Sequence, residues 1–335
     1  MRKLFFFFFL LSTVLSLKAQ DPNFSQFFAS PLTLNPALTG KFDGAFRVAG
    51  NYRNQWPTIN NAFTTATVSL DASILRSSIP EYDQFGFGVM AFTDKSGNGV
   101  LQNNFLAVST AYHKALDESG FHQIGLGFQG TYVNKRLDIA SLKFESMLRA
   151  DGFTGLLDES FSSNQIKLSY FDMNLGLLYN GTNGSSNYYF GASMYHVNRP
   201  KETFKEGNYL LEPRVTFQAG AMVPLGEFNA FHFSANHSRQ ANATNTVIGG
   251  AYMINVTQDP SSPTNLYLGS WFRFGDAIIP YVGLEFGEFQ IGASYDVNTS
   301  SLKPASNMRG GAEISLIYIK KHNDPNVKKL NCPKF

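Results

Sequence analysis

The feature that most constrains the fold is a short pattern repeated along the chain. Segments of about ten residues alternate apolar with polar or glycine residues, and each ends in a turn. Segment 289–297 reads Phe-Gln-Ile-Gly-Ala-Ser-Tyr-Asp-Val, and segment 123–132 reads Gln-Ile-Gly-Leu-Gly-Phe-Gln-Gly-Thr-Tyr. Because successive side chains on a strand point to opposite faces, each segment has one apolar and one polar face. Many such segments are typical of a membrane β-barrel.

The first residues have the composition of a secretion signal. Arg2 and Lys3 precede a short apolar run rich in phenylalanine, and Ala19 stands where a signal peptidase would cut. The predicted mature chain starts at Gln20, and a retained membrane anchor is the alternative. Removing the signal leaves 24 basic and 25 acidic residues of the original 27 and 25, a net charge of −1. This charge does not favour a nucleic-acid partner, and the sequence has no basic stretch mixed with aromatic residues.

The hydropathy separates a strand barrel from a helical membrane bundle. No later segment has the roughly 18–20 consecutive apolar residues of a spanning helix. Mean hydropathy is −0.15, as a barrel allows because only alternate residues meet lipid. Aromatic residues make up 15% of the chain, enough for two interfacial girdles. A soluble β-sandwich shares the alternation but does not explain so many long strands.

We predict a transmembrane antiparallel barrel of about fourteen strands, an even number as in bacterial single-chain barrels. With an even number of strands, both chain termini then lie on the periplasmic side. Its turns there are short, while the two longest connections, 135–167 and 199–212, face outward. The predicted strands are 44–52, 62–73, 84–93, 102–115, 121–134, 168–180, 187–198, 213–224, 228–238, 243–255, 264–275, 278–286, 289–297 and 310–319.

Two hairpins test the register. A two-residue turn at Gly287 and Glu288 pairs Phe286 with Phe289 and places every polar or small residue on one face. The same rule applied at Gly226 mixes the two faces, so that turn is predicted to be longer or bulged.

Two segments are predicted to lie outside the strands. Residues 21–30 have an N-cap aspartate, an early proline and phenylalanines at helical spacing, which predicts a short periplasmic helix ended by Pro31. Its aromatic face would dock on the periplasmic mouth or on a partner. The predicted organisation is a signal peptide (1–19), a periplasmic or plug segment (20–43), the barrel (44–319) and a basic periplasmic tail (320–335).

Motifs for catalysis or ligand binding are incomplete. The Gly-x-Gly-x-x-Gly sequence at 125–130 lies inside a predicted strand, whereas a dinucleotide site needs a strand-to-helix turn. Asp94 begins a calcium-loop-like sequence whose closing glutamate is replaced by Phe105. The histidines are scattered, and Cys332 is the only cysteine. We therefore expect no enzyme activity, no cofactor and no metal site.

Five charged residues fall on inward positions of the C-terminal half of the predicted barrel. Charges in a narrow lumen are expected to pair or to meet water. They form either a network that rigidifies a filled lumen or part of a pathway for ions or solutes. The five residues are Arg214, Arg273, Glu285, Asp296 and Glu313.

Across the mature chain, an ordered set of short motifs resembles the PorP/SprF family of type IX secretion outer-membrane proteins. Leu38 stands where that family usually has an aromatic residue. The motifs are Gln-Asp-Pro-Asn-Phe-Ser-Gln (20–26), Asn-Pro-Ala-Leu-Thr-Gly (35–40), Tyr-Arg-Asn-Gln-Trp (52–56), Asp-Lys-Ser-Gly (94–97), Tyr-Asp-Val-Asn (295–298), Arg-Gly-Gly-Ala-Glu (309–313) and the final Cys-Pro-Lys-Phe. The candidate partner or family-motif residues are Asn35, Pro36, Arg53, Gln55, Trp56, Asp94 and Gly97, which scaffolding alone also explains.

The resemblance implies a barrel of the cell outer membrane that serves secretion or gliding. Its partners would be a secreted or surface-displayed cargo protein, periplasmic components of the type IX system and outer-membrane lipid. The leading hypothesis is a non-enzymatic barrel that helps export or anchor a surface protein. The rivals are a passive porin or hydrophobic-solute transporter, and a barrel enzyme.

Overall fold

The computed structural model describes residues 21–59, 62–76, 78–153, 165–203, 207–258 and 264–322. The predicted signal peptide and the tail with Cys332 lie outside these residues, apart from the first residues of that tail. Among the described residues, no helix is both long enough and apolar enough to cross a membrane.

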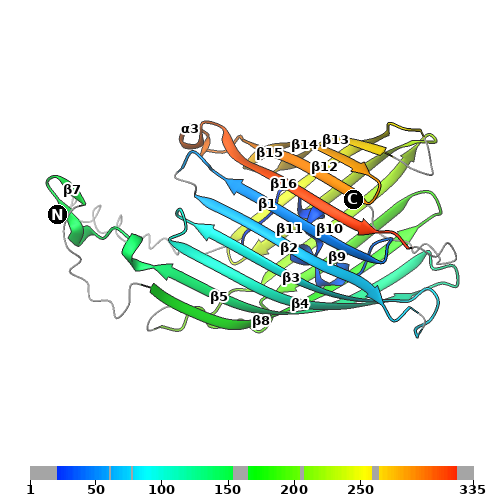
Figure 1. Ribbon diagram of the computed structural model, residues 1–335, viewed down its shortest axis with the longest axis horizontal. Helices are drawn as coiled ribbons and strands as arrows, with labels where there is room; N and C mark the ends of the chain where they lie inside the picture. Colours follow the sequence, from blue (N-terminus) through cyan, green and yellow to red (C-terminus); the bar gives the residue numbers. More distant parts are fainter. Residues whose placement is uncertain are drawn as a thin grey trace, which may run out of the picture.

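Fourteen of the described strands form one closed antiparallel barrel (Figure 1). Each strand pairs with its neighbours in sequence, and the first and last strands close the ring along ten paired positions, from Phe46 with Lys320 to Gln55 with Gly311. The strands are β1 (Phe46–Gln55), β2 (Phe63–Ile74), β3 (Gln84–Ser96), β4 (Leu101–Ala115), β5 (His122–Asp138), β8 (Gln165–Thr182), β9 (Asn187–Tyr195), β10 (Arg214–Leu225), β11 (Asn229–Gln240), β12 (Ala243–Asn255), β13 (Thr264–Arg273), β14 (Ala277–Phe286), β15 (Phe289–Asn298) and β16 (Arg309–Lys320).

The connections distinguish the two ends of the barrel. We call the end at which β1 starts the turn end, because it carries short hairpins, and the opposite end the loop end. The connection from β5 to β8 lies at the loop end and contains η3 (Ile139–Ser141), η4 (Glu145–Met147), β6 (Leu148–Arg149) and β7 (Gly152–Phe153). A short helix, α3 (Lys303–Ser306), lies in the loop-end connection from β15 to β16.

The predicted barrel of fourteen strands is confirmed, and so is the predicted register of one hairpin. Phe286 pairs with Phe289, and Gly283 pairs with Gly292. Gly287 has a φ of +61°, which suits glycine at the first position of a tight turn. The second hairpin pairs Leu225 with Asn229, so its turn has a third residue, as the mixed faces of a two-residue turn predicted.

Side-chain exposure follows the alternation along the strands. In β14, buried and exposed residues alternate from Ala277 to Leu284. The exposed positions are largely apolar, as Leu126 (65% exposed) and Phe217 (57%) illustrate, while many inward positions are polar. The outer surface is therefore apolar and the lumen polar, as a barrel in lipid requires.

The segment before β1 is inside the barrel and is not the helix that we predicted. It contains three short turns: η1 (Phe27–Ala29), α2 (Pro31–Leu34) and η2 (Pro36–Leu38). Pro31 starts α2 at its first position and does not end a helix. The phenylalanines dock in the lumen, not at the periplasmic mouth. We call residues 21–42 the lumenal segment.

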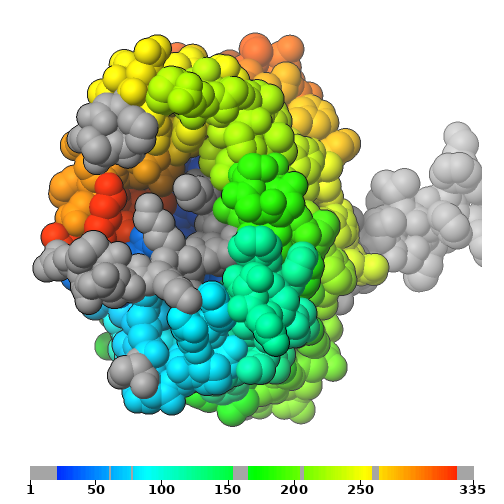
Figure 2. Space-filling model, turned by 90° about the vertical axis from the view of Figure 1, so that its right-hand side faces the viewer, coloured from blue at the N-terminus to red at the C-terminus, as the bar shows by residue number. Residues whose placement is uncertain are grey.

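The lumenal segment crosses the barrel from the loop end to the turn end. Asp21 contacts Gln240, at the loop end of β11. Lys41 contacts Gln84, at the turn end of β3. Figure 2 looks into the turn end, where dark blue atoms of this segment lie inside the ring of strands. The lumen is thus occupied by the chain itself.

Candidate functional site

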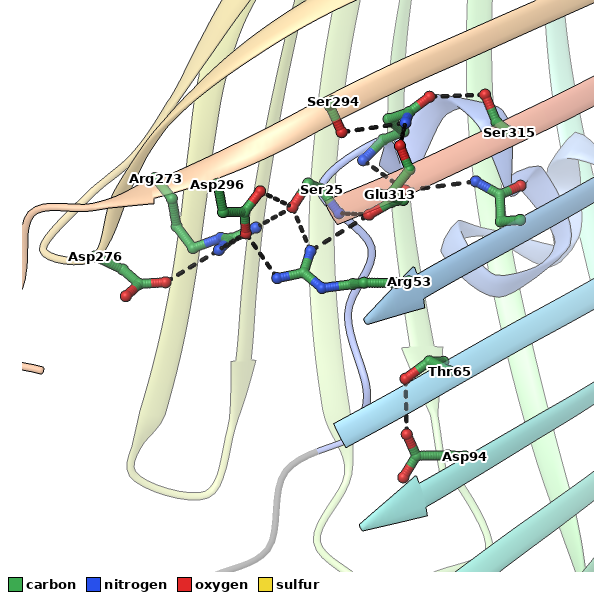
Figure 3. A network of polar contacts seen from close by, with 12 residues as sticks. Ser25, Arg53, Thr65, Asp94, Arg273, Asp276, Ser294, Asp296, Glu313 and Ser315 are labelled. Carbon is green, nitrogen blue, oxygen red and sulfur yellow. Dashed lines mark hydrogen bonds and ion pairs between the residues drawn. The ribbon is translucent and has the colours of Figure 1, made fainter. Parts of the chain in front are cut away.

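The polar contacts that hold the lumenal segment form the candidate site. At its centre, the amides of Ser25 and Gln26 donate to the two oxygens of Glu313, at 2.7 and 3.0 Å. The Ser25 hydroxyl donates to Asp296 at 2.7 Å. Both carboxylates come from the last two strands of the barrel, so these strands hold the start of the segment (Figure 3).

Two arginines balance these two carboxylates. Arg53 of β1 pairs with Asp296 at 2.7 Å and with Glu313 at 3.4 Å, and its side chain is only 3% exposed. Arg273 of β13 pairs with Asp296 at 2.7 Å and with Asp276 at 3.0 Å. Both guanidinium groups also reach the Ser25 hydroxyl. Each buried charge in this network faces at least one opposite charge, which offsets the cost of its burial.

The side chain of Gln26 extends this network along β15 and β16. Its amide nitrogen donates to the Ser294 hydroxyl at 3.1 Å and to the Glu313 carbonyl at 3.0 Å. Its oxygen accepts from the Ser315 hydroxyl at 2.7 Å. The buried amide is therefore bonded through both of its polar atoms, as a group removed from water requires.

A second cluster holds the first described residue at the loop end. His196, which follows β9, lies 2.8 Å from the Asp21 carboxylate and 3.0 Å from that of Asp172. Arg214 lies 3.4 Å from Asp21, and its guanidinium stacks on Tyr195. Burial by itself would lower the pKa of His196, but the two carboxylates raise this pKa to about 9. Burial opposes the shift of Asp21 as well, yet His196 and Arg214 hold its pKa below the ordinary value.

Side chains of the wall bind the backbone carbonyls of α2. Gln129 and Tyr195 both donate to the Leu32 carbonyl, at 3.1 and 3.0 Å. The next two carbonyls, of residues 33 and 34, accept from Arg214 at 3.2 Å and from Ser193 at 2.8 Å. The last carbonyls of a helix have no partner within it, so the wall satisfies them.

Glycines on the inner wall make room for the motif Asn-Pro-Ala-Leu-Thr-Gly at 35–40. A Cβ added to Gly127 would lie 2.2 Å from the Ala37 nitrogen, and one added to Gly176 would lie 1.9 Å from the Asn35 side-chain oxygen. Gly127 and Gly176 are direct cross-strand partners on β5 and β8. The motif therefore packs directly against the backbone of β5 and β8, where no side chain stands between them.

Asn35 attaches the start of this motif to the wall. Its side-chain nitrogen donates to the carbonyls of Leu177 and Ala192, at 2.9 and 3.3 Å, on two adjacent strands. Its oxygen accepts from the Ala37 amide at 2.8 Å, which caps η2. One side chain thus shapes the turn at Pro36 and attaches it to the wall.

The end of the segment is fixed at the turn end. The Gly40 amide donates to Asp71 at 2.7 Å, and Asp71 also pairs with Arg47 at 2.8 Å. Gln84 donates to the Gly40 carbonyl at 2.5 Å. A positive φ of +69° and close contact with Gly86 both require glycine at position 40.

Apolar contacts fill the space between these polar ones. The Phe28 ring lies 4.8 Å from that of Trp271 and 5.5 Å from that of Tyr281. Phe24 faces Phe92 at 6.4 Å. The helical spacing of the phenylalanines therefore serves packing against different parts of the wall.

The structure brings together only some of the residues that the sequence singled out. Arg53, Arg273, Asp296 and Glu313 form one network, whereas Arg214 belongs to the Asp21 cluster. Glu285 bonds instead to Tyr267 and Asn265, at 2.6 and 3.0 Å.

The remaining motif residues lie near the loop end. Gln55 ends β1, and the Trp56 ring packs on Phe63. Asp94 accepts from Thr65 at 2.8 Å, and Gly97 begins the turn into β4. In the described parts of the chain, no three His, Cys, Asp or Glu side chains are grouped closely enough to hold a metal ion.

The sequence reading missed Asp21, His196, Asp172, Asp71 and the wall glycines. Asp71 and Asp172 stand on inward positions of their strands, and this signal was present in the alternation. His196 lies just beyond the end of β9, where the strand alternation no longer predicts whether a side chain points inward or outward. Nothing in the sequence indicated which residues the wall glycines contact.

The chain is similar to solved structures at low sequence identity, and a match with a TM-score above 0.5 supports the fold. The TodX deltaS2S3 mutant monoaromatic hydrocarbon channel matches with a TM-score of 0.51 and 10% identity, over 87% of this chain and 94% of that one. A Pseudomonas aeruginosa FadL homologue matches with a TM-score of 0.44 and 9% identity, over 85% and 92%. CdiB from Acinetobacter baumannii matches with a TM-score of 0.36 and 8% identity over 82% of this chain, which spans only 59% of CdiB. No curated protein matches the sequence.

The closed strand ring, its apolar exterior and the solved barrels that it resembles define an outer-membrane β-barrel. Residues 16–318 match the family described as type IX secretion system membrane protein PorP/SprF. The chain belongs to this family.

A substitution of Gly176 tests how the lumenal segment is seated. Gly176→Ala places a methyl group on Asn35, so we expect residues 35–40 to shift and the protein to lose about 1–3 kcal/mol of stability. Hydrogen exchange of residues 21–42 is expected to accelerate. Gly50→Ala is the control, because a Cβ added at Gly50 would lie 3.7 Å from its nearest neighbour, the Thr67 carbonyl oxygen. Equal exchange in the two variants would contradict the close contact.

The charge balance at Arg53 has its own test. Arg53→Met leaves two buried carboxylates with one cation fewer and is expected to cost about 3–5 kcal/mol of unfolding free energy. Adding Glu313→Gln is expected to recover part of this loss in reversible urea unfolding. Arg199→Met, which breaks an ion pair whose arginine is 48% exposed, is expected to cost less than about 1 kcal/mol. Strictly additive effects of the first two changes would refute the coupling.

The Asp21–His196 contact predicts a dependence on pH. Since the folded pKa of His196, about 9, exceeds the ordinary 6.5, its contribution is complete below pH 6.5 and is lost as the pH rises through 9. Asp21 contributes above its ordinary pKa of 3.8, and this contribution is lost as the pH falls. A spin label at Asn23, in a Cys332→Ser background, should gain mobility near pH 9. In the His196→Gln variant, the label should be mobile at all pH values. If this variant kept the same alkaline transition, His196 would not be its cause.

Proposed function

We propose that this barrel is a non-enzymatic component of type IX secretion that helps to export or anchor a surface protein through its loop end. The observation that carries the proposal is the occupied lumen. Residues 21–42 bind the wall from one end of the barrel to the other, so a cargo protein would contact the rim and not the interior.

The loop-end connection from β9 to β10 contacts the two strands that flank the other long connection. Lys135 at the end of β5 pairs with Glu202, and Tyr170 of β8 donates to Glu202 at 3.4 Å. The Glu202 amide donates to the Tyr209 carbonyl at 2.9 Å, and Lys201 forms an antiparallel bridge with Leu210. Glu202, within the predicted external loop 199–212, is thus held against β5 and β8, which flank the predicted external loop 135–167.

Apolar side chains at the loop end are exposed to a protein partner. Tyr209 and Leu210 are 38% and 45% exposed, and Leu148 and Phe153 on the small β6–β7 hairpin are 51% and 47% exposed. Exposed aromatic and aliphatic residues amid charges are the usual anchors of protein interfaces. The turn end, with its short hairpins, would face the periplasmic components of the secretion system.

Surface display of secreted proteins in a deletion strain tests this function. We expect display of at least one surface protein to be lost and to return with the wild-type gene. Tyr209→Ser with Leu210→Ser should restore display poorly, since a central interface residue contributes about 2 kcal/mol or more. Val256→Ser, at a 60% exposed site of the turn end, is the control.

Two outcomes would contradict the proposal. One is unchanged display of all surface proteins in the deletion strain. The other is a large steady conductance of the purified protein in planar bilayers, which would favour the passive porin.

A further inference from the structure

A large apolar hollow lies on the outer surface of the barrel, over strands β3 to β10. Its volume is about 620 Å³, within the range of small-molecule sites. The side chains on its rim point away from the lumen, as the exposures of Leu126, Leu175 and Phe217 (65%, 46% and 57%) show. This surface faces lipid, so the hollow opens into the membrane.

Small residues create the hollow among large ones. Thr110 and Ala192 are the short outward side chains of β4 and β9, and the backbones of Gly127 and Gly176 form part of the floor. The walls are Phe85, Tyr112, Leu126, Phe128, Leu175 and Phe217. A depression with aromatic and aliphatic walls suits a hydrocarbon chain.

The floor of the hollow is the wall that holds Asn35 from the other side. The Asn35 side chain donates to the carbonyls of Leu177 and Ala192, and both residues also line the hollow. Only one layer of backbone separates the apolar site from the lumenal segment. A hydrocarbon chain packed in the hollow would therefore support the strand backbone that binds Asn35.

A polar edge borders the hollow on its turn-end side. Lys114 lies two residues, or about 7 Å, beyond Tyr112 on the outer face of β4. Its side chain is 56% exposed although Asp83 lies 3.1 Å away. On the next strand, His122 shares a hydrogen bond of 2.8 Å with the Tyr179 hydroxyl. An apolar hollow with a cation at its edge matches an acyl chain with a phosphate at its head.

We propose that this hollow binds one acyl chain of a glycerophospholipid from the periplasmic leaflet, with the phosphate at Lys114. The choice of occupant follows from charge, because the half-exposed ammonium group lies at the turn end. The site is distinct from the loop-end surface, and its failure would leave the proposed function untouched.

Native mass spectrometry of the full-length protein, purified in mild detergent, tests the site. We expect the wild type to retain one phospholipid mass after washing and to rebind added phosphatidylglycerol. Ala192→Phe fills the hollow, and the loss of two methylene contacts predicts binding weaker by about tenfold or more. Lys114→Gln should weaken binding of phosphatidylglycerol several-fold.

A matched control variant separates this site from general lipid contact. Ala293→Phe makes the same change at an outward alanine of β15, on another part of the wall. It should retain lipid as the wild type does. Equal retention by the two phenylalanine variants would overturn the proposal. The proposal would also be overturned if the extra mass came from a lipid attached covalently to the protein and not from a bound phospholipid.

Discussion

The buried ion pairs across the strand seam are the interaction on which the rest of the structure depends. Arg53 and Glu313 stand opposite each other on β1 and β16, the strands that close the barrel. The same Glu313 accepts the amides of Ser25 and Gln26. Removing one partner of such a pair is costly because it leaves an uncompensated charge. One group of charges therefore couples closure of the wall to occupation of the lumen.

The lumenal segment is held largely through its backbone. Wall side chains donate to the carbonyls of Leu32, Thr33 and Leu34, and wall glycines admit the backbone near Asn35. Recognition of this kind depends on shape and direction more than on the identity of each side chain. It explains why the segment has only short helical turns: the wall supplies the hydrogen bonds that a longer helix would have made internally.

The strand pattern was predictable because each strand reports its two environments independently of distant parts of the chain. The same alternation placed Arg273, Asp296 and Glu313 inside the barrel. It could not show that Arg53 would join them, because that contact depends on how the first and last strands meet. The predicted helix at 21–30 failed for a related reason. The spacing of Phe24, Phe27 and Phe28 is helical, but distant carboxylates bind the amides nearby and a tertiary contact overrides local preference.

The hydrogen bond between the Ser25 amide and Glu313 joins residues 288 positions apart. Contacts between such distant residues carry the loop-closure entropy of nearly the whole polypeptide and form late. Ser25 and Gln26 must therefore wait for β16, the last strand, before they reach their final positions. The lumenal segment is therefore expected to be the last part to settle, although it precedes every strand in the sequence.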